Sequence, residues 1–254
     1  MISQQEIEQI VSLVKREVVP AIGCTEPVAV SLCVAKATEV LGQLPEKIQL
    51  YLSANVLKNA MGVGIPGTKM VGLPIAVALG ALIGKSEYQL QVLKDLSPAD
   101  VERGRQYISE KRIEISLKEN ITENLYIEVH CLAEEDRSIV VIQNTHTNIS
   151  YIEKNREVLY QCGSVSGNED ESCDDITLSF AKVYEFATTV PIEDICFILK
   201  AAELNREASR MSSQGNYGHN VGKTVQGKLG KQIFGDSILS HMMSYTAAAC
   251  DARM

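Results

Sequence analysis

The stretch LYIEVHCLAEEDRSIVVIQNTHTNISYI, residues 125–152, decides the fold class because apolar and polar residues alternate along three of its segments. The segments are residues 125–132, 138–143 and 148–152, and the charged sequence EEDR at 134–137 marks a turn between the first two. A period of two is typical of strands with one buried face, and short turns join antiparallel neighbours. We therefore predict an antiparallel or mixed sheet built on a three-stranded meander.

Two helices are predicted at the amino-terminal end of the chain. Ser3 begins a capping box ahead of an apolar period of 3.6 residues, so residues 3–18 should form an amphipathic helix. A second helix should start with Thr25 or Glu26 as its cap and end at Gly42. Because this second helix carries little charge, we expect it to be buried on most sides.

The region between these helices and the meander mixes three kinds of structure. Residues 47–53 alternate as a strand does. Residues 54–84 contain a glycine-rich loop between two helical pieces. A further helix is capped by Ser97 and runs to about residue 112.

A boundary is predicted after the meander, because residues 155–175 have no sustained period and contain a cluster of acidic residues. Helical patterns follow at residues 176–189, 192–212, 224–234 and 237–254. The sequence thus predicts an α+β fold: a helix-covered, antiparallel or mixed sheet domain over residues 1–160, then an all-helical segment. This segment, residues 176–254, would begin a second domain.

Composition excludes several classes of protein. The chain of 254 residues has 24 Lys and Arg against 32 Asp and Glu, a net charge of −8. This balance, with no basic stripe, argues against nucleic acid as a partner. The longest uncharged apolar run, residues 70–84, is shorter than the about 20 residues that span a bilayer, so no membrane helix is predicted. The acidic amino terminus is unlike a signal peptide, which predicts a cytoplasmic protein with its seven cysteines as thiols.

Two common site patterns fail on spacing. The sequence GKT at 222–224 resembles the end of a phosphate loop, but the motif requires glycine at position 217, which is Tyr217, and a preceding strand. The cysteines near the meander also lack the close spacing that is typical of structural zinc. Neither an ATPase nor a zinc protein is therefore predicted.

Most cysteines have a structural explanation. Cys33 and Cys196 lie in apolar helical runs and Cys131 lies in a strand, where free cysteine packs as a small hydrophobe. Cys162 and Cys173 fall in or beside the acidic segment, whose negative field blunts the reactivity of a thiol. None of the five is a candidate catalytic residue.

Cys24 differs because it immediately precedes a predicted helix. Unpaired N–H groups and the positive end of the helix dipole stabilise a thiolate there, which can act as a base or a nucleophile. Glu26 opposes this as a nearby negative charge unless it caps the helix or binds a substrate ammonium. A simply buried thiol is the alternative explanation.

Two further groups of residues have both a structural and a functional explanation. Cys250 follows three alanines, which suit close helix packing but also the approach of a bulky group. His146, Thr147 and Asn148 offer polar groups on a loop held by the sheet, and a well-paired loop histidine is the alternative.

Five blocks of sequence carry a resemblance to a known family. They are GCTEPVAV at 23–30, KNAMGVGIPGT at 58–68, GLPIA at 72–76, HTN at 146–148 and ACDARM at 249–254. In this order they resemble the L-cysteine desulfidase family, part of the wider serine dehydratase alpha-chain-like group. The resemblance covers nearly the whole chain, and the acidic segment is the part that has no match.

This resemblance implies an iron–sulfur lyase that converts L-cysteine and water to pyruvate, ammonia and hydrogen sulfide through a [4Fe–4S] cluster, without pyridoxal phosphate. Matched by position, Cys24 corresponds to the proton acceptor and Cys250 to the first of three cluster ligands. Lys58 and the glycine loop are our candidates for the substrate carboxylate. The candidate substrate-binding residues are Thr25, Glu26, Asn55, Lys58, Asn59, Gly64, Gly67, His146, Thr147 and Asn148.

The resemblance also implies that family members continue beyond the position of Met254 and carry the two other cluster cysteines there. We therefore expect a truncated chain that is inactive alone and whose apolar, uncapped final helix is open to homo-oligomer formation. An L-serine dehydratase-like deaminase and a non-enzymatic amino-acid-binding domain stay open as alternatives. In each case the expected partner is a small amino acid, with neither nucleic acid nor membrane.

Overall fold

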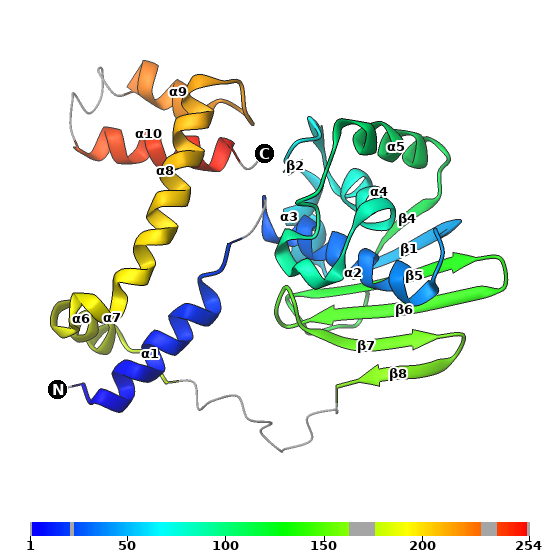
Figure 1. Cartoon of the computed structure of the whole chain (residues 1–254), viewed down its shortest axis with the longest axis horizontal. Coiled ribbons are helices and arrows are strands. Elements are labelled where there is room, and N and C mark those ends of the chain that lie inside the picture. Colours follow the sequence, from blue (N-terminus) through cyan, green and yellow to red (C-terminus); the bar gives the residue numbers. More distant parts are fainter. Residues whose placement is uncertain (1, 21–22, 163–175, 230–237, 253–254) are drawn as a thin grey trace.

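The computed structural model describes residues 2–20, 23–162, 176–229 and 238–252. Figure 1 shows them in two groups, which we call the α+β unit, residues 23–161, and the helical unit, helix α1 (Gln4–Glu17) with residues 176–252. The fold class predicted from the sequence, a helix-covered mixed sheet followed by a helical segment, is therefore confirmed.

The α+β unit is organised by one six-stranded sheet with the order β4-β1-β5-β6-β7-β8. Its strands are β1 (Lys47–Leu52), β4 (Ile113–Leu117), β5 (Tyr126–Ala133), β6 (Asp136–Gln143), β7 (Ile149–Lys154) and β8 (Glu157–Gln161). The pair β1 and β4 is parallel and the other pairs are antiparallel, so the sheet is mixed. The predicted meander is confirmed as β5, β6 and β7, whereas the two edge strands β4 and β8 were not predicted.

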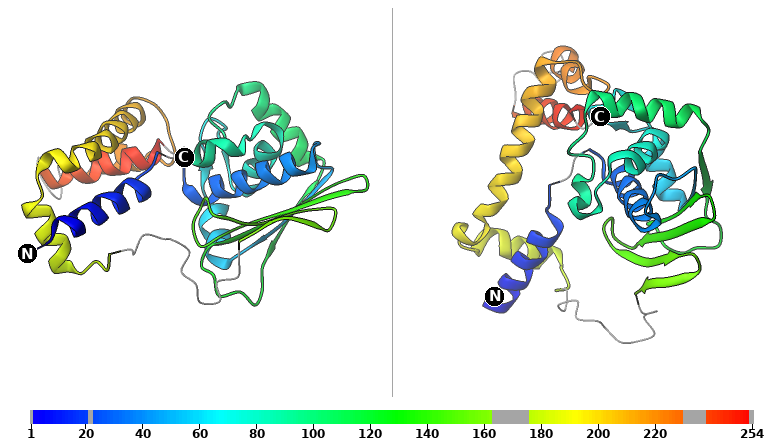
Figure 2. Two further views of the ribbon diagram at one scale, coloured as in Figure 1. Left: turned by 60° about the horizontal axis from the view of Figure 1, so that its bottom comes forward. Right: turned by 45° about the vertical axis from the view of Figure 1, so that its right-hand side comes forward.

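Helices cover one face of this sheet, as Figure 2 shows for α2 (Thr25–Leu41). Helix α4 (Leu73–Ile83) packs on α2, and α5 (Pro98–Ser109) packs on α4. At Gly80 a Cβ would lie 2.7 Å from the carbonyl oxygen of Ser31, so only glycine allows α2 and α4 to come this close. As predicted, α2 is buried on most of its surface.

The glycine-rich loop forms a small hairpin between two helices. Helix α3 (Ala54–Met61) precedes β2 (Gly64–Ile65) and β3 (Met70–Val71), and a 3-10 helix, η1 (Ser86–Gln91), lies after α4. Gly67 has a φ of +79° in the turn of the hairpin, a conformation that side chains disfavour. The predicted loop between two helical pieces is thus present, with more regular structure than expected.

The helical unit contains a break that the sequence pattern did not predict. Its elements are α6 (Phe180–Thr189), α7 (Ile192–Ile195), the 3-10 helix η2 (Cys196–Ile198), α8 (Leu199–Gln214), α9 (Val221–Thr224), the π-helical turn η3 (Val225–Leu229) and α10 (Ile238–Asp251). The predicted helix over residues 192–212 is therefore interrupted at 196–198. Helix α10 packs against both α8 and α9.

Helix α1 contacts the helical unit, although its residues lie within the 1–160 range that we predicted as the first domain. The Glu6 carboxylate is 2.9 Å from the Lys182 ammonium on α6. The amide N–H of Ile2 donates to the Glu185 carboxylate at 2.9 Å, and the Lys15 ammonium lies 5.1 Å from the centre of the Phe197 ring. The capping box at Ser3 is formed as predicted. An amphipathic pattern shows that a helix has a partner without showing which one.

Several sequence features fall outside the described residues. They are the acidic cluster with Cys173 and the two last residues of the ACDARM block. Within the described ranges, no helix is both long and apolar enough to cross a membrane.

Candidate functional site

Cys24 lies at the start of α2, where we expected a reactive thiol. It is the N-cap residue of this helix, with φ −71° and ψ 140°, and it is partly exposed. The cap predicted from the sequence was Thr25 or Glu26, but these are the first two helical residues. Their side chains are therefore free for other contacts, and the amide groups of the first turn surround the Cys24 position.

Glu26 is the centre of a group of candidate residues. The Asn59 amide donates to one carboxylate oxygen at 3.0 Å, and the Thr25 hydroxyl donates to the other at 3.1 Å. The Asn59 amide also lies 3.5 Å from the Asn55 side-chain oxygen. The structure thus joins residues of α2 and α3 that are more than 25 positions apart.

The Glu26 carboxylate is held in its charged form. Partial burial opposes ionisation, but the backbone N–H of Glu26 and the side chains of Asn59 and Thr25 donate hydrogen bonds, so the pKa is lowered overall. His146 also lowers this pKa through its charge, which places it near Glu26. An ionised carboxylate with amide and hydroxyl neighbours is suited to bind an ammonium group.

The loop that carries His146 is held by its own hydrogen bonds. The Asn148 amide donates to the Gln143 carbonyl at 3.1 Å, and the Asn148 backbone N–H donates to the Thr145 carbonyl at 3.3 Å. The side-chain amide of Asn148 therefore has a structural role, which presents His146 and Thr147 at the turn between β6 and β7. Both of these residues are partly exposed.

Lys58, Gly64 and Gly67 are less closely connected to Glu26. Lys58 is exposed on α3, Gly64 is a buried strand residue paired with Val71, and Gly67 is exposed in the turn. Among the described residues, no hydrogen bond joins any of the three to Glu26. Their proposed role with a substrate carboxylate stays a prediction.

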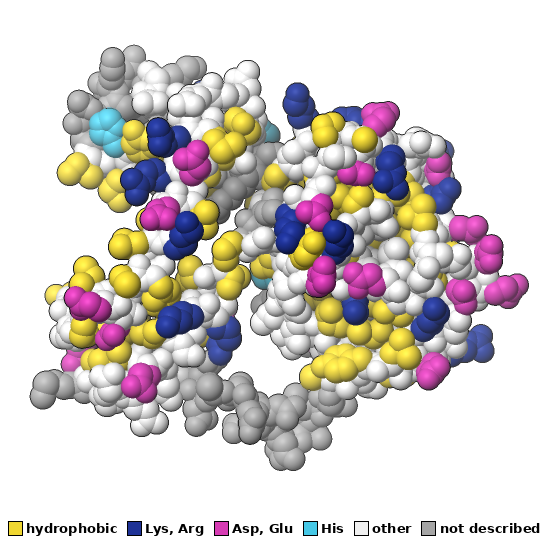
Figure 3. Space-filling model, in the orientation of Figure 1, with side chains coloured by type: hydrophobic (Ala, Val, Ile, Leu, Met, Phe, Trp, Pro, Cys, Tyr) yellow, Lys and Arg dark blue, Asp and Glu magenta, His cyan; other side chains and the backbone are white. Residues whose placement is uncertain are grey.

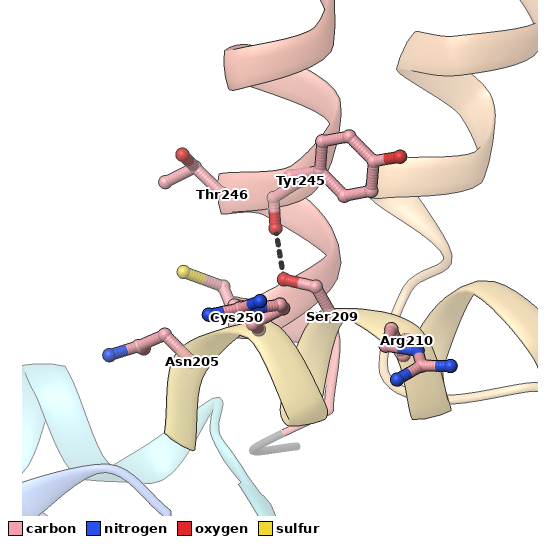
Figure 4. A pocket seen from close by; sticks show the side chains of 8 residues that line it. Asn205, Ser209, Arg210, Tyr245, Thr246 and Cys250 are labelled. Carbon is pink, nitrogen blue, oxygen red and sulfur yellow. Dashed lines mark hydrogen bonds between the residues drawn. The ribbon is translucent and has the colours of Figure 1, made fainter. Parts of the chain in front are cut away.

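Cys250 lies in the helical unit, on a groove between α8 and α10 (Figure 4). The groove has a volume of about 680 Å³, and the Cys250 side chain is exposed beside it. Next to it, Asp251 is buried and its carboxylate accepts the Gly222 N–H at 2.8 Å. One residue of the ACDARM block thus fixes the helix while its neighbour is accessible.

The GKT sequence has a structural role in the helical unit. A Cβ at Gly222 would lie 2.6 Å from the backbone nitrogen of Ala248, so glycine lets α9 touch α10. The Lys223 ammonium donates to the carbonyl of Gly215, the residue that ends α8. Both residues are therefore used in packing the helical unit.

The other cysteines divide by burial. Cys33 and Cys131 are fully buried, as expected, and burial raises the pKa of the Cys131 thiol to about 12. Cys33 donates to the Val140 carbonyl at 3.4 Å. Cys196 is exposed, which corrects the prediction that it packs as a buried hydrophobe. The reason is the interruption of the predicted helix at this residue.

The thiols fit the implied cluster only in part. An iron–sulfur cluster is bound by several cysteine thiolates. Among the described residues there is no group of three His, Cys, Asp or Glu side chains that could hold a metal ion. Cys250 thus offers one accessible ligand, and the described residues do not supply a complete set.

The two candidate cysteines belong to ends of helices that lie near each other. In Figure 1 and in both views of Figure 2, the carboxyl-terminal end of α10 lies beside the start of α2. Figure 4 shows Cys250 and Asn205 pointing to the same side of the pair formed by α8 and α10. The fold therefore brings sequence blocks from opposite ends of the chain to one region.

Sequence reasoning missed two groups of polar residues. Arg206 and Arg210 line the groove, and their spacing of four on a predicted helix was the available signal. On the sheet face that α2 does not cover, the Glu128 carboxylate contacts Tyr126, His130 and Lys118 at 2.5, 2.8 and 2.7 Å. The alternation in β5 places Tyr126, Glu128 and His130 on one face, but Lys118 comes from outside the meander.

The fold and the site define a class of protein: a mixed α+β unit with a cysteine at the start of a buried helix, joined to a helical unit with an exposed cysteine. No family model matches the chain, and no solved structure matches it.

The chain is similar to curated UPF0597 proteins of several bacteria. It is 58% identical to one from Bacteroides fragilis over 252 residues, which are 99% of this chain and 59% of the relative. It is 46% identical to one from Porphyromonas gingivalis and 41% identical to one from Dichelobacter nodosus, covering 97% and 99% of this chain and 58% of each relative. The chain thus spans about three fifths of the length of these relatives, whose name states no activity.

Proposed function

We propose that this chain is part of an iron–sulfur lyase that converts L-cysteine and water to pyruvate, ammonia and hydrogen sulfide. One observation carries the proposal: two of the sequence blocks behind the family resemblance meet at Glu26. The Asn59 amide of the second block donates to the Glu26 carboxylate at 3.0 Å, although the two residues lie 33 positions apart. The Glu26 carboxylate is ionised and partly exposed, so it is accessible to a ligand.

In this proposal Cys24 removes the proton from the α-carbon of the substrate. The start of α2 favours a thiolate because its first amide groups lack helical partners and the helix dipole is positive there. Glu26 binds the substrate ammonium, and Asn59 and Thr25 hold the carboxylate of Glu26 in place, while Asn55 contacts Asn59. His146 and Thr147 lie at the side of the same site.

The bond changes balance without an external oxidant. Cys24 takes up the α-proton, and the C–S bond breaks with its electron pair on the sulfur, which leaves as hydrosulfide. The hydrosulfide takes up a proton to become hydrogen sulfide, and an aminoacrylate remains. This enamine becomes an imine, and water converts it to pyruvate and ammonia.

The free thiols of the chain suit a reducing compartment such as the cytoplasm.

Cys250 is the proposed first ligand of a [4Fe–4S] cluster. When bound, such a cluster with one open iron position acts as a Lewis acid on the leaving sulfur. Since the described residues offer one accessible thiol on the groove, the other ligands would come from parts of the longer relatives outside the match.

The test uses the full-length protein, reconstituted without oxygen, and measures sulfide and pyruvate from L-cysteine. We expect equal amounts of both products, and a loss of about 10²–10⁴ in kcat for Cys24→Ala, as for removal of a general base. Cys196→Ala is the matched control, because this thiol is exposed in another part of the helical unit. Wild-type rates for Cys24→Ala would contradict the proposal.

The same assay separates the two alternatives. L-Serine in place of L-cysteine tests the deaminase, which would give pyruvate without sulfide. Calorimetry with L-cysteine and L-serine tests a binding domain, for which heat of binding without any product would be the result. Pyruvate from L-serine with no sulfide from L-cysteine, or heat of binding with no product from either amino acid, would overturn the cysteine lyase.

A further inference from the structure

The groove between α8 and α10 has the features of a binding site for an organic anion. We infer that it takes a small carboxylate with an apolar body, held by Arg206 and Arg210. The groove has a volume of about 680 Å³, within the range of sites for small molecules. The inference deepens the proposed function, on which it rests only for the natural ligand, the carboxylate of the amino-acid substrate.

The two arginines are the charged residues that line the groove. They lie four positions apart on α8, so they project from the same side of the helix. Among the described residues, neither forms an ion pair. Glu203, on the same helix, is 3.1 Å from Lys200, and neither Glu203 nor Glu207 lines the groove. In the part of the chain that the structure describes, the two arginines therefore present positive charge to the groove without an ion-pair partner.

The other groups around the groove favour an organic ligand over an inorganic one. Tyr245 and Ala249 supply apolar surface from α10. The Ser209 hydroxyl donates to the Tyr245 carbonyl at 2.7 Å, as the dashed line in Figure 4 shows, so it is occupied. The donors left for a ligand are mainly the guanidinium groups, whose planar shape fits a carboxylate.

In the proposed lyase the natural ligand is the substrate carboxylate, because Cys250, the proposed cluster ligand, lines the same groove. An α-amino acid needs one anionic and one cationic partner. Glu26 is suited to the ammonium, and Lys58, the candidate that the sequence suggests for the carboxylate, is exposed on α3. Arg206 and Arg210 line the same groove as Cys250 and carry the charge that the carboxylate requires.

The test measures the rate at which iodoacetamide alkylates Cys250 in this chain, followed by mass spectrometry of each cysteine peptide. The probe is 3-phenylpropanoate, with 3-phenylpropanamide as its neutral analogue. At about ten times its dissociation constant, the carboxylate should slow alkylation of Cys250 about tenfold, because only the free protein reacts. Alkylation of Cys196 should not change, and the amide should give little protection.

Variants identify the residues. Arg206→Gln combined with Arg210→Gln should lower the affinity for the carboxylate about tenfold or more, as expected for the loss of charged hydrogen bonds. Lys200→Gln removes a cation from the same helix outside the groove and should leave protection unchanged. Equal protection by the amide, or full protection in the double variant, would overturn the inference. These outcomes do not depend on the cluster or on Cys24, so failure here is distinct from failure of the lyase.

Discussion

The α+β unit and the helical unit differ in how they bury apolar residues. The continuous hydrophobic core lies within the α+β unit, where Leu50, Ile75 and Ile127 are fully buried. In the helical unit large apolar side chains face outward: Phe180 is 87% exposed and Ile238 is 80% exposed. Figure 3 shows hydrophobic side chains spread over the surface of this unit.

This difference shows that the two units are held together by different interactions. The α+β unit is stabilised by removal of apolar area from water. The described contacts of the helical unit include close approaches of small residues, such as Gly222 on Ala248, hydrogen bonds from side chains to backbone, and the ion pair between Glu6 and Lys182. The same substitution should therefore have different effects in the two units.

The largest expected effect comes from truncating one leucine in each unit. Leu50→Ala should lower the free energy of unfolding by about 2–5 kcal/mol, because it leaves a cavity in the core. Leu199→Ala changes a side chain that is 62% exposed and should stay within about 0.5 kcal/mol. Denaturant unfolding followed by circular dichroism measures both. Equal losses would show that the helical unit has a closed core after all.

A smaller effect is expected at the contact between α9 and α10. Gly222→Ala places a methyl group against the backbone of Ala248 and should destabilise the helical unit by about 1–3 kcal/mol. Gly227→Ala is the matched control, since a Cβ there has no atom within 4 Å. Hydrogen exchange should speed up in α10 for the first variant alone. Unchanged exchange in α10 would mean that this contact does not hold the unit.

At the candidate site the expected effect is the loss of one hydrogen bond to the Glu26 carboxylate, worth about 1 kcal/mol. Asn59→Leu removes the amide that donates to Glu26, so the Glu26 pKa should rise towards its ordinary value. Asn55→Ala is the control, because its side chain contacts Asn59 and not the carboxylate. Titration of the carboxyl carbon by NMR measures both variants. An unchanged Glu26 pKa in Asn59→Leu would contradict the arrangement described for this site.

The smallest effect concerns the uncovered face of the sheet. Burial raises the pKa of the Glu128 carboxyl, but hydrogen bonds from His130, Lys118 and Tyr126 outweigh burial and lower this pKa to about 2. Because this pKa is below that of the unfolded chain, about 4.5, the stabilisation is present above pH 4.5 and is lost as the pH falls towards 2.

Tyr126→Phe should therefore lower the free energy of unfolding at pH 7 and reduce the amount by which this free energy falls between pH 7 and pH 2. Tyr51→Phe is the control, because it keeps the hydrogen bonds to Glu128. Unfolding measured between pH 7 and pH 2 tests this. An acid profile of Tyr126→Phe identical to that of the wild type would show that the Tyr126 hydroxyl does not stabilise the carboxylate.

Local patterns predicted much of the α+β unit. The meander follows from alternation, and α1 follows from its capping box. Strand β4 was missed although Ile113, Ile115 and Leu117 alternate, because it is short and its parallel partner β1 is distant in sequence. Strand β8 was missed because VLY at 158–160 is a continuous apolar run, and its register with β7 is irregular at that point. Non-local pairing decided both strands.

The candidate site was predictable residue by residue, but its arrangement was not. Cys24 could be placed at a helix start from the proline and polar residues that follow it. That Asn59 and His146 would approach Glu26 depends on the packing of α3 and of the β6–β7 turn around α2. The contact between α1 and the helical unit could not be predicted either, because the ion pair of Glu6 with Lys182 joins residues that are distant in the sequence.

The central claim, that Cys24 removes the α-proton of L-cysteine, is tested most directly with α-deuterated substrate. Sulfide release by the reconstituted full-length protein should be slower from the deuterated substrate than from ordinary L-cysteine, and Cys24→Ala should release almost none from either. Sulfide release by Cys24→Ala at the wild-type rate, with the same isotope effect, would contradict the account.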